Sequence, residues 1–479
     1  MSTKLTYRPS LLVVTVLSAL FAMPHAVGAA EDAARPVTFT RDVAPILQEK
    51  CQGCHRVGDM APMSLITYQE TRPWARAIKQ KVSKREMPPW FIDRTVGIQK
   101  YKNDDSLTDA QIATIVNWVD AGAPEGNRAD MPPAKAFASN EGWSIGTPDL
   151  ILHKPKPFKM YAQGSDWWLT ETVETGLTED RWVKAVQLTP GNRKIVHHYC
   201  AGPVPSGPAR GPDVGAVGPP DRYAQEEREA ALEERKLAGE GVVGAAAGQS
   251  VSGGIGGGSL GCYLPGRGGV FFAEDTGVLL KAGSKVSIGF HYSASGEEAS
   301  DDSSIGLVFY PEGVTPTHAV KGGFFQKFPA FELDIPANAR VTNDAYMRLV
   351  KPTRLLSFQP HMHMRGSALV LEAILPSGRV LTISGVTNYN FGWQLEYVYD
   401  DDLTPLLPAG TMLHAIVVHD NTAENRFNPD PNRWVGYGQA STEEMAGSFV
   451  TYIELTDEEY RKLASERRAK QRMSATQQE

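Results

Sequence analysis

The chain has 479 residues, 42% of them hydrophobic, which is enough for several compact units with buried cores. Its formal net charge is −7, so no broad cationic surface is expected. This composition argues against a nucleic-acid partner and is compatible with an enzyme.

The N-terminus predicts an export signal over residues 1–30. Lys4 and Arg8 precede an apolar run over residues 11–23, and small residues follow as far as Ala30. The run is short for a membrane span and no second long one follows, so cleavage at the alanine pair ending at Ala30 is expected, with an uncleaved anchor as the alternative. We therefore expect a periplasmic or secreted protein without stable membrane insertion after signal cleavage.

The stretch CQGCH contains the C-x-x-C-H signature of covalent haem attachment. In this signature the thiols of Cys51 and Cys54 bond to the haem vinyl groups, and His55 becomes the proximal iron ligand. A redox or zinc C-x-x-C is the competing interpretation, but the adjacent histidine, the export signal and the lack of a second C-x-x-C favour haem. One covalently bound c-type haem is therefore predicted.

Three methionines compete for the role of sixth haem ligand, and Met87 is the preferred one. It lies in the stiff stretch REMPPW, after a predicted helix over residues 71–84 for which Thr71 is a candidate cap. Met60 and Met63 follow the second cysteine too closely to reach the opposite haem face with ease. The sixth ligand is therefore expected to be a thioether, which raises the haem potential.

A further helix is predicted at LTDAQIATIVNWVDAGAP, where apolar residues recur at helical spacing. Thr108 is its candidate cap and Gly122 ends the pattern. This stretch resembles the last helix of small class I cytochromes c. We therefore expect a small all-α class I cytochrome c domain over residues 31–140.

From about Gly146 onward, short β-rich runs such as RWVKAVQL and MLHAIVVH alternate with turn residues, which is typical of antiparallel sandwiches. We expect two all-β antiparallel, jelly-roll-like sandwich domains over residues 141–327 and 328–457. A Gly- and Ala-rich insert over residues 203–261 cannot bury a core and is expected to be a surface excursion. A charged helical tail over residues 458–479, preceded by a capping box, ends the chain.

Five of the eleven histidines form two pairs and one further strand position. His361 and His363 are two residues apart, so on a strand they face the same side and can bind one ion. His197 and His198 are adjacent and would diverge on a regular strand, so joint binding requires a bulge or a strand end, with His291 as third ligand. A lone histidine is more often a satisfied polar or surface group, but this clustering favours metal binding. Imidazoles with an added thioether suit copper better than zinc.

With these motifs in this order, the chain resembles the copper type II, ascorbate-dependent monooxygenases, the family of peptidylglycine α-hydroxylating monooxygenase and dopamine β-monooxygenase. The segments that carry the resemblance are GLTEDRWVKAVQLTPGNRKIVHHY, GFHYS, FQPHMHMRG, NYNFGWQLEY, VVHDNTAENRFNPDPNRW and STEEMAG. The chain is most similar to the bacterial branch that carries an N-terminal cytochrome c. The resemblance covers residues 146–455, which is both β regions.

The resemblance implies two copper ions. The ligands of the electron-transfer copper correspond to His197, His198 and His291. The ligands of the O2-binding copper, which are the catalytic residues, correspond to His361, His363 and Met445. The residues alone do not distinguish this methionine from others in the region, since a methionine is usually core filler. Those others are Met362, Met364 and Met412.

The activity that the resemblance implies is copper-dependent monooxygenation. The expected partners are O2 and a small-molecule or peptide substrate whose C–H bond is hydroxylated. The fused haem leads us to expect that it replaces or relays the small-molecule reductant, with a periplasmic electron donor upstream. The alternatives are a non-enzymatic haem and copper electron-transfer or copper-handling protein, and a binding module on an inherited fold.

Several residues near the motifs have more than one interpretation. Cys200 and Cys262 flank the insert and are expected to form a disulfide in an oxidising compartment. Arg365 is a candidate for holding a substrate carboxylate or for supporting the strand end. His419 is expected to be structural rather than a ligand. The aromatic residues of NYNFGW either line a pocket or pack in the core.

Overall fold

The computed structural model describes residues 35–57, 61–135, 142–164, 166–204, 259–263, 269–438 and 441–476. The predicted export signal, Met60, most of the predicted insert and the last residues of the predicted tail lie outside this set.

Short helices dominate the N-terminal part of the described chain. They are η1 (Phe39–Val43), α2 (Ala44–Lys50), α3 (Tyr68–Thr71), η2 (Arg72–Trp74), α4 (Ala75–Ser83), α5 (Asp109–Asp120) and η3 (Arg128–Asp130). Phe39, Leu47 and Trp118 are fully buried in the core that these helices share. Helix α5 begins where predicted, because Thr108 and Gln111 form a capping box that satisfies two backbone N–H groups.

The helix predicted over residues 71–84 begins earlier and is interrupted. Thr67 rather than Thr71 is the cap, and its side chain accepts a hydrogen bond from the backbone N–H of Glu70. Thr71 is buried instead, and its hydroxyl donates to the Thr67 carbonyl oxygen at 2.8 Å. Pro73 then lies in the 3-10 turn η2, where its missing N–H is tolerated.

The strands belong to two regions of the sequence, preceded by β1 (Ile92–Gly97). The first region contains β2 (Leu150–His153), β3 (Phe158–Met160), β4 (Trp167–Glu174), β5 (Arg181–Thr189), β6 (Val196–Pro203), β7 (Gly261–Tyr263), β8 (Val270–Phe271), β9 (Thr276–Leu280), β10 (Lys285–Tyr292), β11 (Ala299–Asp301) and β12 (Ser304–Phe309). The second region contains β13 (His318–Gln326), η4 (Ala330–Glu332), β14 (Asp334–Ile335), β15 (Arg340–Arg348), β16 (Thr353–His361), β17 (Gly366–Ile374), β18 (Val380–Val386), η5 (Phe391–Trp393), β19 (Tyr397–Val398), β20 (Leu406–Leu407), β21 (Met412–Asp420), β22 (Val435–Gly436) and β23 (Gly447–Glu454).

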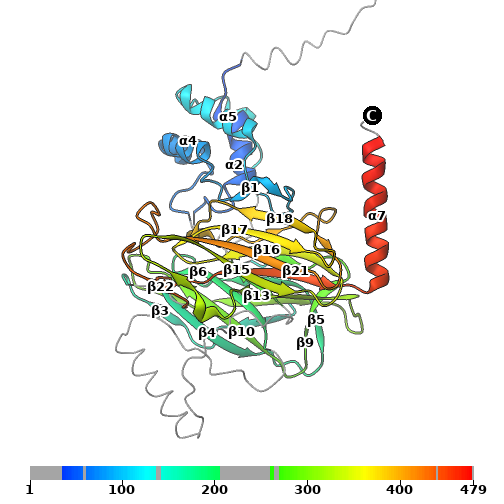
Figure 1. The fold of residues 1–479 in the computed structure, drawn as a ribbon. Helices are drawn as coiled ribbons and strands as arrows, with labels where there is room; N and C mark the ends of the chain where they lie inside the picture. Colours follow the sequence, from blue (N-terminus) through cyan, green and yellow to red (C-terminus); the bar gives the residue numbers. More distant parts are fainter. Residues whose placement is uncertain are drawn as a thin grey trace, which may run out of the picture.

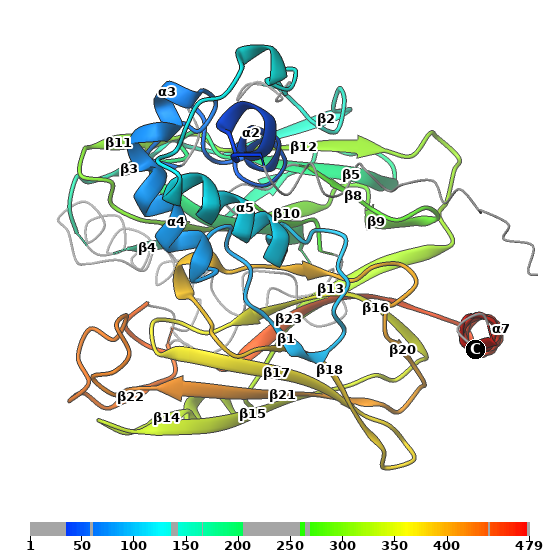
Figure 2. The same ribbon diagram turned by 90° about the horizontal axis from the view of Figure 1, so that it is seen from above.

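One long sheet runs through both regions. Within the described residues it has ten strands, with the order β19-β16-β23-β13-β9-β5-β12-β2, while β20 pairs with β16 and β8 pairs with β5. A four-stranded sheet, β4-β10-β6-β7, packs over the first-region half, and a five-stranded sheet, β1-β18-β17-β21-β15, packs over the second-region half. Figure 2 shows the two regions side by side. Strand β13 pairs antiparallel with β23 and parallel with β9, so the expectation of two separate antiparallel sandwiches is wrong.

The expected all-α class I cytochrome c domain is also wrong, because this part of the chain adds a strand to the second β region. Strand β1 pairs antiparallel with β18 and extends the five-stranded sheet (Figure 1). Ile92 and Tyr101 are buried in the core of that region, and Trp90 packs edge-on against Tyr397 with ring centroids 4.9 Å apart. Several apolar side chains between α4 and α5 are therefore buried against a distant sheet, whereas Leu107 is buried in the core of the helices.

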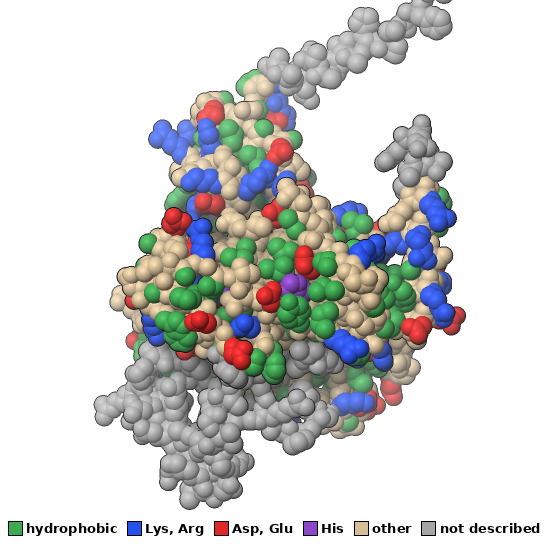
Figure 3. Space-filling view, viewed as in Figure 1, with side chains coloured by type: hydrophobic (Ala, Val, Ile, Leu, Met, Phe, Trp, Pro, Cys, Tyr) green, Lys and Arg blue, Asp and Glu red, His purple; other side chains and the backbone are tan. Residues whose placement is uncertain are grey.

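Helix α7 (Asp457–Thr476) stands beside the β body at the end of the described chain (Figure 1). Its first turn has the predicted capping box of Thr456 and Glu459. Arg467 donates to the Thr404 carbonyl oxygen at 2.7 Å, which ties the helix to the body. On the face drawn in Figure 3, Lys and Arg side chains gather along this helix. Among the described residues, no helix combines the length and the apolar character that a membrane span requires.

Gly97, at the end of β1, provides a test of this docking. Its φ is +62°, and a Cβ there would meet the backbone carbonyl group of Ile383. A left-handed φ alone costs about 1–2 kcal/mol for a residue with a side chain. Because of the added clash, Gly97→Ala is expected to lower the free energy of unfolding by more than this. Gly122→Ala is the matched control, since Gly122 has a φ of +89° with no atom near a new Cβ. Denaturant unfolding compares the two variants, and equal losses would contradict the docking of β1 on β18.

Candidate metal centre

Three histidines converge where β6 and β10 pair. His291 lies opposite His198 in the ladder. The next pair is Tyr292 with Val196, which leaves His197 in a bulge. A bulge is what the sequence analysis required for two adjacent histidines to serve one site. The candidate ligand atoms of the three imidazoles all lie within 4.8 Å of one another.

The outer nitrogens of two of these rings are held by oxygen acceptors. Nε2 of His197 donates to the Gly392 carbonyl oxygen at 3.2 Å, and Nε2 of His291 donates to Asp166 Oδ2 at 2.8 Å. A neutral imidazole has one N–H, so Nδ1 of each ring then carries a lone pair. Nδ1 of His197 lies 3.1 Å from Nδ1 of His291 and 3.3 Å from Nδ1 of His198.

Nitrogen lone pairs that face one another at this distance repel unless a cation lies between them. The separations of 3.1 and 3.3 Å also match metal–nitrogen bonds of about 2 Å. The three imidazoles therefore fit a metal ion bound through Nδ1. An all-imidazole donor set suits copper, zinc, iron or nickel.

Burial keeps the imidazoles of His197 and His198 neutral. It lowers the pKa of His197 to about 4, with the charge of His291 as the second cause. The same two causes hold the pKa of His198 well below its ordinary value. The indole of Trp168 stacks on His291 with ring centroids 4.0 Å apart and covers that face of the site. A neutral imidazole offers its lone pair to a metal without first losing a proton.

The second histidine pair is held in a similar way at the end of β16. Nδ1 of His361 bonds to Gln394 Oε1 at 2.9 Å, and Nδ1 of His363 bonds to the Glu443 carbonyl oxygen at 3.1 Å. A metal would then be bound through Nε2 of both rings. The rings lie edge to face with centroids 5.4 Å apart. Burial first, and then the charge of His363, lower the pKa of His361 to about 3.

Met445 lies in the segment that runs along this pair. Its side chain is buried, and it directly follows Glu444, whose carboxylate accepts the backbone N–H of His363 at 2.8 Å. Gly447, just beyond Met445, pairs with His361 in the sheet. The residues on either side of Met445, the third predicted ligand, therefore contact both histidines.

The two histidine groups lie close together across two aromatic rings. Trp168, which stacks on His291, has its ring centroid 6.2 Å from that of His363. Phe391 lies 6.1 Å from both His197 and His363, centroid to centroid. The structure therefore places the two predicted ligand groups next to each other.

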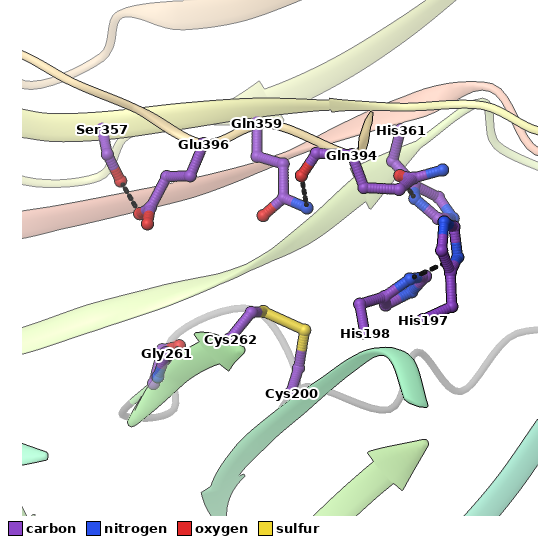
Figure 4. Close-up of a disulfide and its surroundings, with 11 residues drawn as sticks. His197, His198, Cys200, Gly261, Cys262, Ser357, Gln359, His361, Gln394 and Glu396 are labelled. Carbon is purple, nitrogen blue, oxygen red and sulfur yellow. Dashed lines mark hydrogen bonds between the residues drawn. A yellow bond between two sulfur atoms is a disulfide. The ribbon is translucent and has the colours of Figure 1, made fainter. Parts of the chain in front are cut away.

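The expected disulfide between Cys200 and Cys262 is present and joins β6 to β7. Figure 4 shows it on the layer that carries His198, with His361 and Gln394 on the facing layer. The disulfide therefore secures the strand that carries the first histidine group, close to that group.

Two residues with open interpretations have structural roles. Arg365 is fully buried, and its guanidinium donates to Asn421 Oδ1 at 2.8 Å and to the Thr442 carbonyl oxygen at 3.0 Å. These hydrogen bonds support the strand end, which fits the second of the two roles expected of Arg365. His419 is buried and its Nε2 donates to the Met445 carbonyl oxygen at 3.0 Å, which fits the structural role expected of it.

Sequence analysis does not identify Asp166, Trp168 or Gln394 as parts of this centre. The stretch DWW is remote from every histidine motif in the sequence, and only the pairing of β4 with β10 sets Trp168 opposite His291. Gln394 lies in the aromatic stretch whose role the sequence leaves open. The neighbouring aromatic residues are the one local signal that could have drawn attention to it.

The residues predicted to attach haem, Cys51, Cys54 and His55, form one turn after α2. Cys54 and His55 donate their backbone N–H groups to the Cys51 carbonyl oxygen at 3.1 and 3.0 Å. Nδ1 of His55 donates to the Met63 carbonyl oxygen at 3.3 Å, and burial raises the pKa of the Cys51 thiol to about 12. Met87 lines a cavity of about 120 Å³ that none of these three residues lines. The structure therefore joins the three predicted attachment residues in one turn, while Met87 remains the predicted sixth ligand.

No protein-family model matches this chain, and no curated protein matches it. Among solved structures, the major capsid protein P2 from bacteriophage PM2 is 9% identical, with 64% of this chain and 96% of that chain covered and a TM-score of 0.24. The structure of infectious bursal disease virus Gt strain gives 11% identity, coverage of 65% and 74%, and a TM-score of 0.15. Likenesses this weak carry no argument about fold or function.

The stability of the metal-free protein should depend on pH through these histidines. Below about pH 6.5 the unfolded chain protonates them, whereas the folded protein keeps His197 neutral down to about pH 4 and His361 down to about pH 3. The unfolded state then binds more protons, so the free energy of unfolding falls as the pH is lowered from about 7 to about 4. Urea unfolding of the chelator-treated protein measures this slope. A double variant, His197→Gln with His361→Gln, should have a flatter one, and identical slopes would contradict the buried neutral imidazoles.

Proposed function

We propose that this protein is a periplasmic, copper-dependent monooxygenase that hydroxylates a C–H bond of a small molecule or peptide with O2. The observation that carries the proposal is the convergence of five histidines in two adjacent groups, with Met445 beside the second. Copper accepts both imidazole and thioether ligands, so both donor sets fit it. The resemblance of the sequence motifs to copper type II, ascorbate-dependent monooxygenases supports the same assignment.

Bound copper would supply O2 binding and one-electron chemistry at this centre. The chain itself holds the ligands in place from outside: Asp166 and the Gly392 carbonyl oxygen hold the first group, and Gln394 and the Glu443 carbonyl oxygen hold the second. Four of the five histidines, His198, His291, His361 and His363, are buried, which limits the access of water. Such a preorganised, shielded set of donors is what a reactive metal centre requires.

We also propose that electrons reach this centre through a c-type haem attached to Cys51 and Cys54, with His55 as the iron ligand and Met87 as the sixth ligand. The bond from His55 Nδ1 to the Met63 carbonyl oxygen supports this, since a metal-binding histidine usually donates its other N–H to such an acceptor. These residues fit the attachment of a haem, which supplies single electrons. A periplasmic donor would be the partner that reduces it.

Metal analysis of protein matured in a periplasm tests the proposal. About two coppers per haem are expected, from elemental analysis beside the pyridine haemochrome spectrum. His291→Ala should lose about one copper, and His361→Ala should lose the other. His414→Ala is the matched control, because this histidine bonds to Asp344 at 2.7 Å and is not part of the centre. Haem without any copper would contradict the metal centre.

Oxygen uptake by the copper-loaded protein then separates an enzyme from an electron carrier. With ascorbate as the reductant and a set of peptides and small molecules offered as substrates, the unaltered protein should consume O2 and reoxidise its haem only when a substrate is present, and His361→Ala should do neither above background. A protein that keeps both coppers but consumes no O2 would instead be an electron-transfer or copper-handling protein.

A further inference from the structure

We propose that Asp166 is a positioning residue for the metal centre, whose carboxylate orients the ring of His291 and ties it to the segment that carries Met445. The inference rests on the proposed function and adds a residue that no metal-binding motif in the sequence indicates.

The Asp166 carboxylate joins the two β regions at one oxygen atom. Its Oδ2 accepts the Nε2–H of His291 at 2.8 Å and the hydroxyl of Ser441 at 3.3 Å. His291 belongs to β10 in the first region, whereas Ser441 lies in the second region shortly before Met445. Removal of this oxygen atom therefore removes one contact to His291 and one contact to the segment that carries Met445.

A carboxylate beside one imidazole nitrogen determines what the other nitrogen can do. It keeps the proton on the nearer nitrogen, leaves the lone pair on the farther one and raises the basicity of that nitrogen. In His291 the farther nitrogen is Nδ1, which faces Nδ1 of His197 at 3.1 Å. His197 is held by a neutral carbonyl oxygen at the longer distance of 3.2 Å, so the carboxylate orients His291 more firmly than the carbonyl orients His197.

Trp168, on strand β4 directly after Asp166 and Trp167, removes the remaining freedom of the His291 ring. Trp168 stands two positions after Asp166, so on an extended strand the two side chains point to the same side. Asp166 bonds to the edge of the imidazole, while the indole of Trp168 stacks on its face at 4.0 Å and an interplanar angle of 15°. Edge and face contacts together allow one ring orientation.

The chain contains a matched pair with the same arrangement outside the centre. On β21, Nε2 of His414 bonds to Asp344 Oδ1 at 2.7 Å, and the ring of Tyr346 stacks on His414 at 4.5 Å. Asp344 and Tyr346 are also two positions apart on one strand, β15. Asp344→Ala therefore removes a carboxylate–imidazole bond of the same kind without touching the proposed ligands.

The test uses the full-length protein with His361→Ala, so that only the first histidine group is complete. Copper(II) affinity is measured by competition with a chelator of known affinity, and the ligand field by electron paramagnetic resonance. Adding Asp166→Ala should weaken copper binding by about 10–100-fold and change the copper hyperfine coupling. Asp166→Asn, which keeps an acceptor and loses the charge, should recover part of the affinity, and Asp344→Ala should change neither quantity.

Thermal unfolding of the metal-free variants shows whether each one folds. If Asp166→Ala does not fold, Asp166→Asn carries the test, with a several-fold weaker affinity and an altered spectrum expected. Unchanged affinity and an unchanged spectrum in a folded Asp166 variant would overturn the positioning role while leaving the proposed function intact. A parent protein that binds no copper would overturn both.

Discussion

Hydrogen bonds to the outer nitrogens of the histidine rings are the interaction on which the candidate metal centre depends. Nε2 of His197 and His291, and Nδ1 of His361 and His363, each meet an oxygen acceptor within 3.2 Å. Because a neutral imidazole has one N–H, these bonds decide which nitrogen carries the lone pair. The first group would thus bind a metal through Nδ1 and the second through Nε2, and neither choice depends on the metal itself.

The long sheet shared by the two regions explains why a histidine of the first region, His197, bonds to an oxygen atom of the second region, the Gly392 carbonyl oxygen. Strand β13 pairs with β23 on one side and with β9 on the other, so the layers that carry the two histidine groups are built on one continuous sheet. The first group is held partly by Gly392, and the Asp166 carboxylate is shared with Ser441. The contacts that join the regions are therefore also the contacts that orient the ligands.

Strand β1 adds a third part to this assembly. It fastens the helical segment with Cys51, Cys54 and His55 to the five-stranded sheet of the second region. The proposed haem is thus carried by the region that holds His361, whereas the resemblance assigns electron transfer to the histidine group of the first region. Because the two histidine groups lie next to each other across Trp168 and Phe391, the first group is also close to that region.

The sequence by itself determined the features that depend on neighbouring residues. The capping boxes before α5 and α7, the β-rich runs and the need for a bulge at His197 follow from local spacing, and the structure contains all of them. The disulfide was predicted from compartment and from two flanking cysteines, and it is present. Tertiary structure alone decided the pairing of β1 with β18, the long sheet shared by both regions, and the places of Asp166 and Gln394 beside the histidines. Each of these depends on contacts between segments far apart in the chain, and local periodicity carries no information about which distant partner will bury an apolar side chain or accept a hydrogen bond.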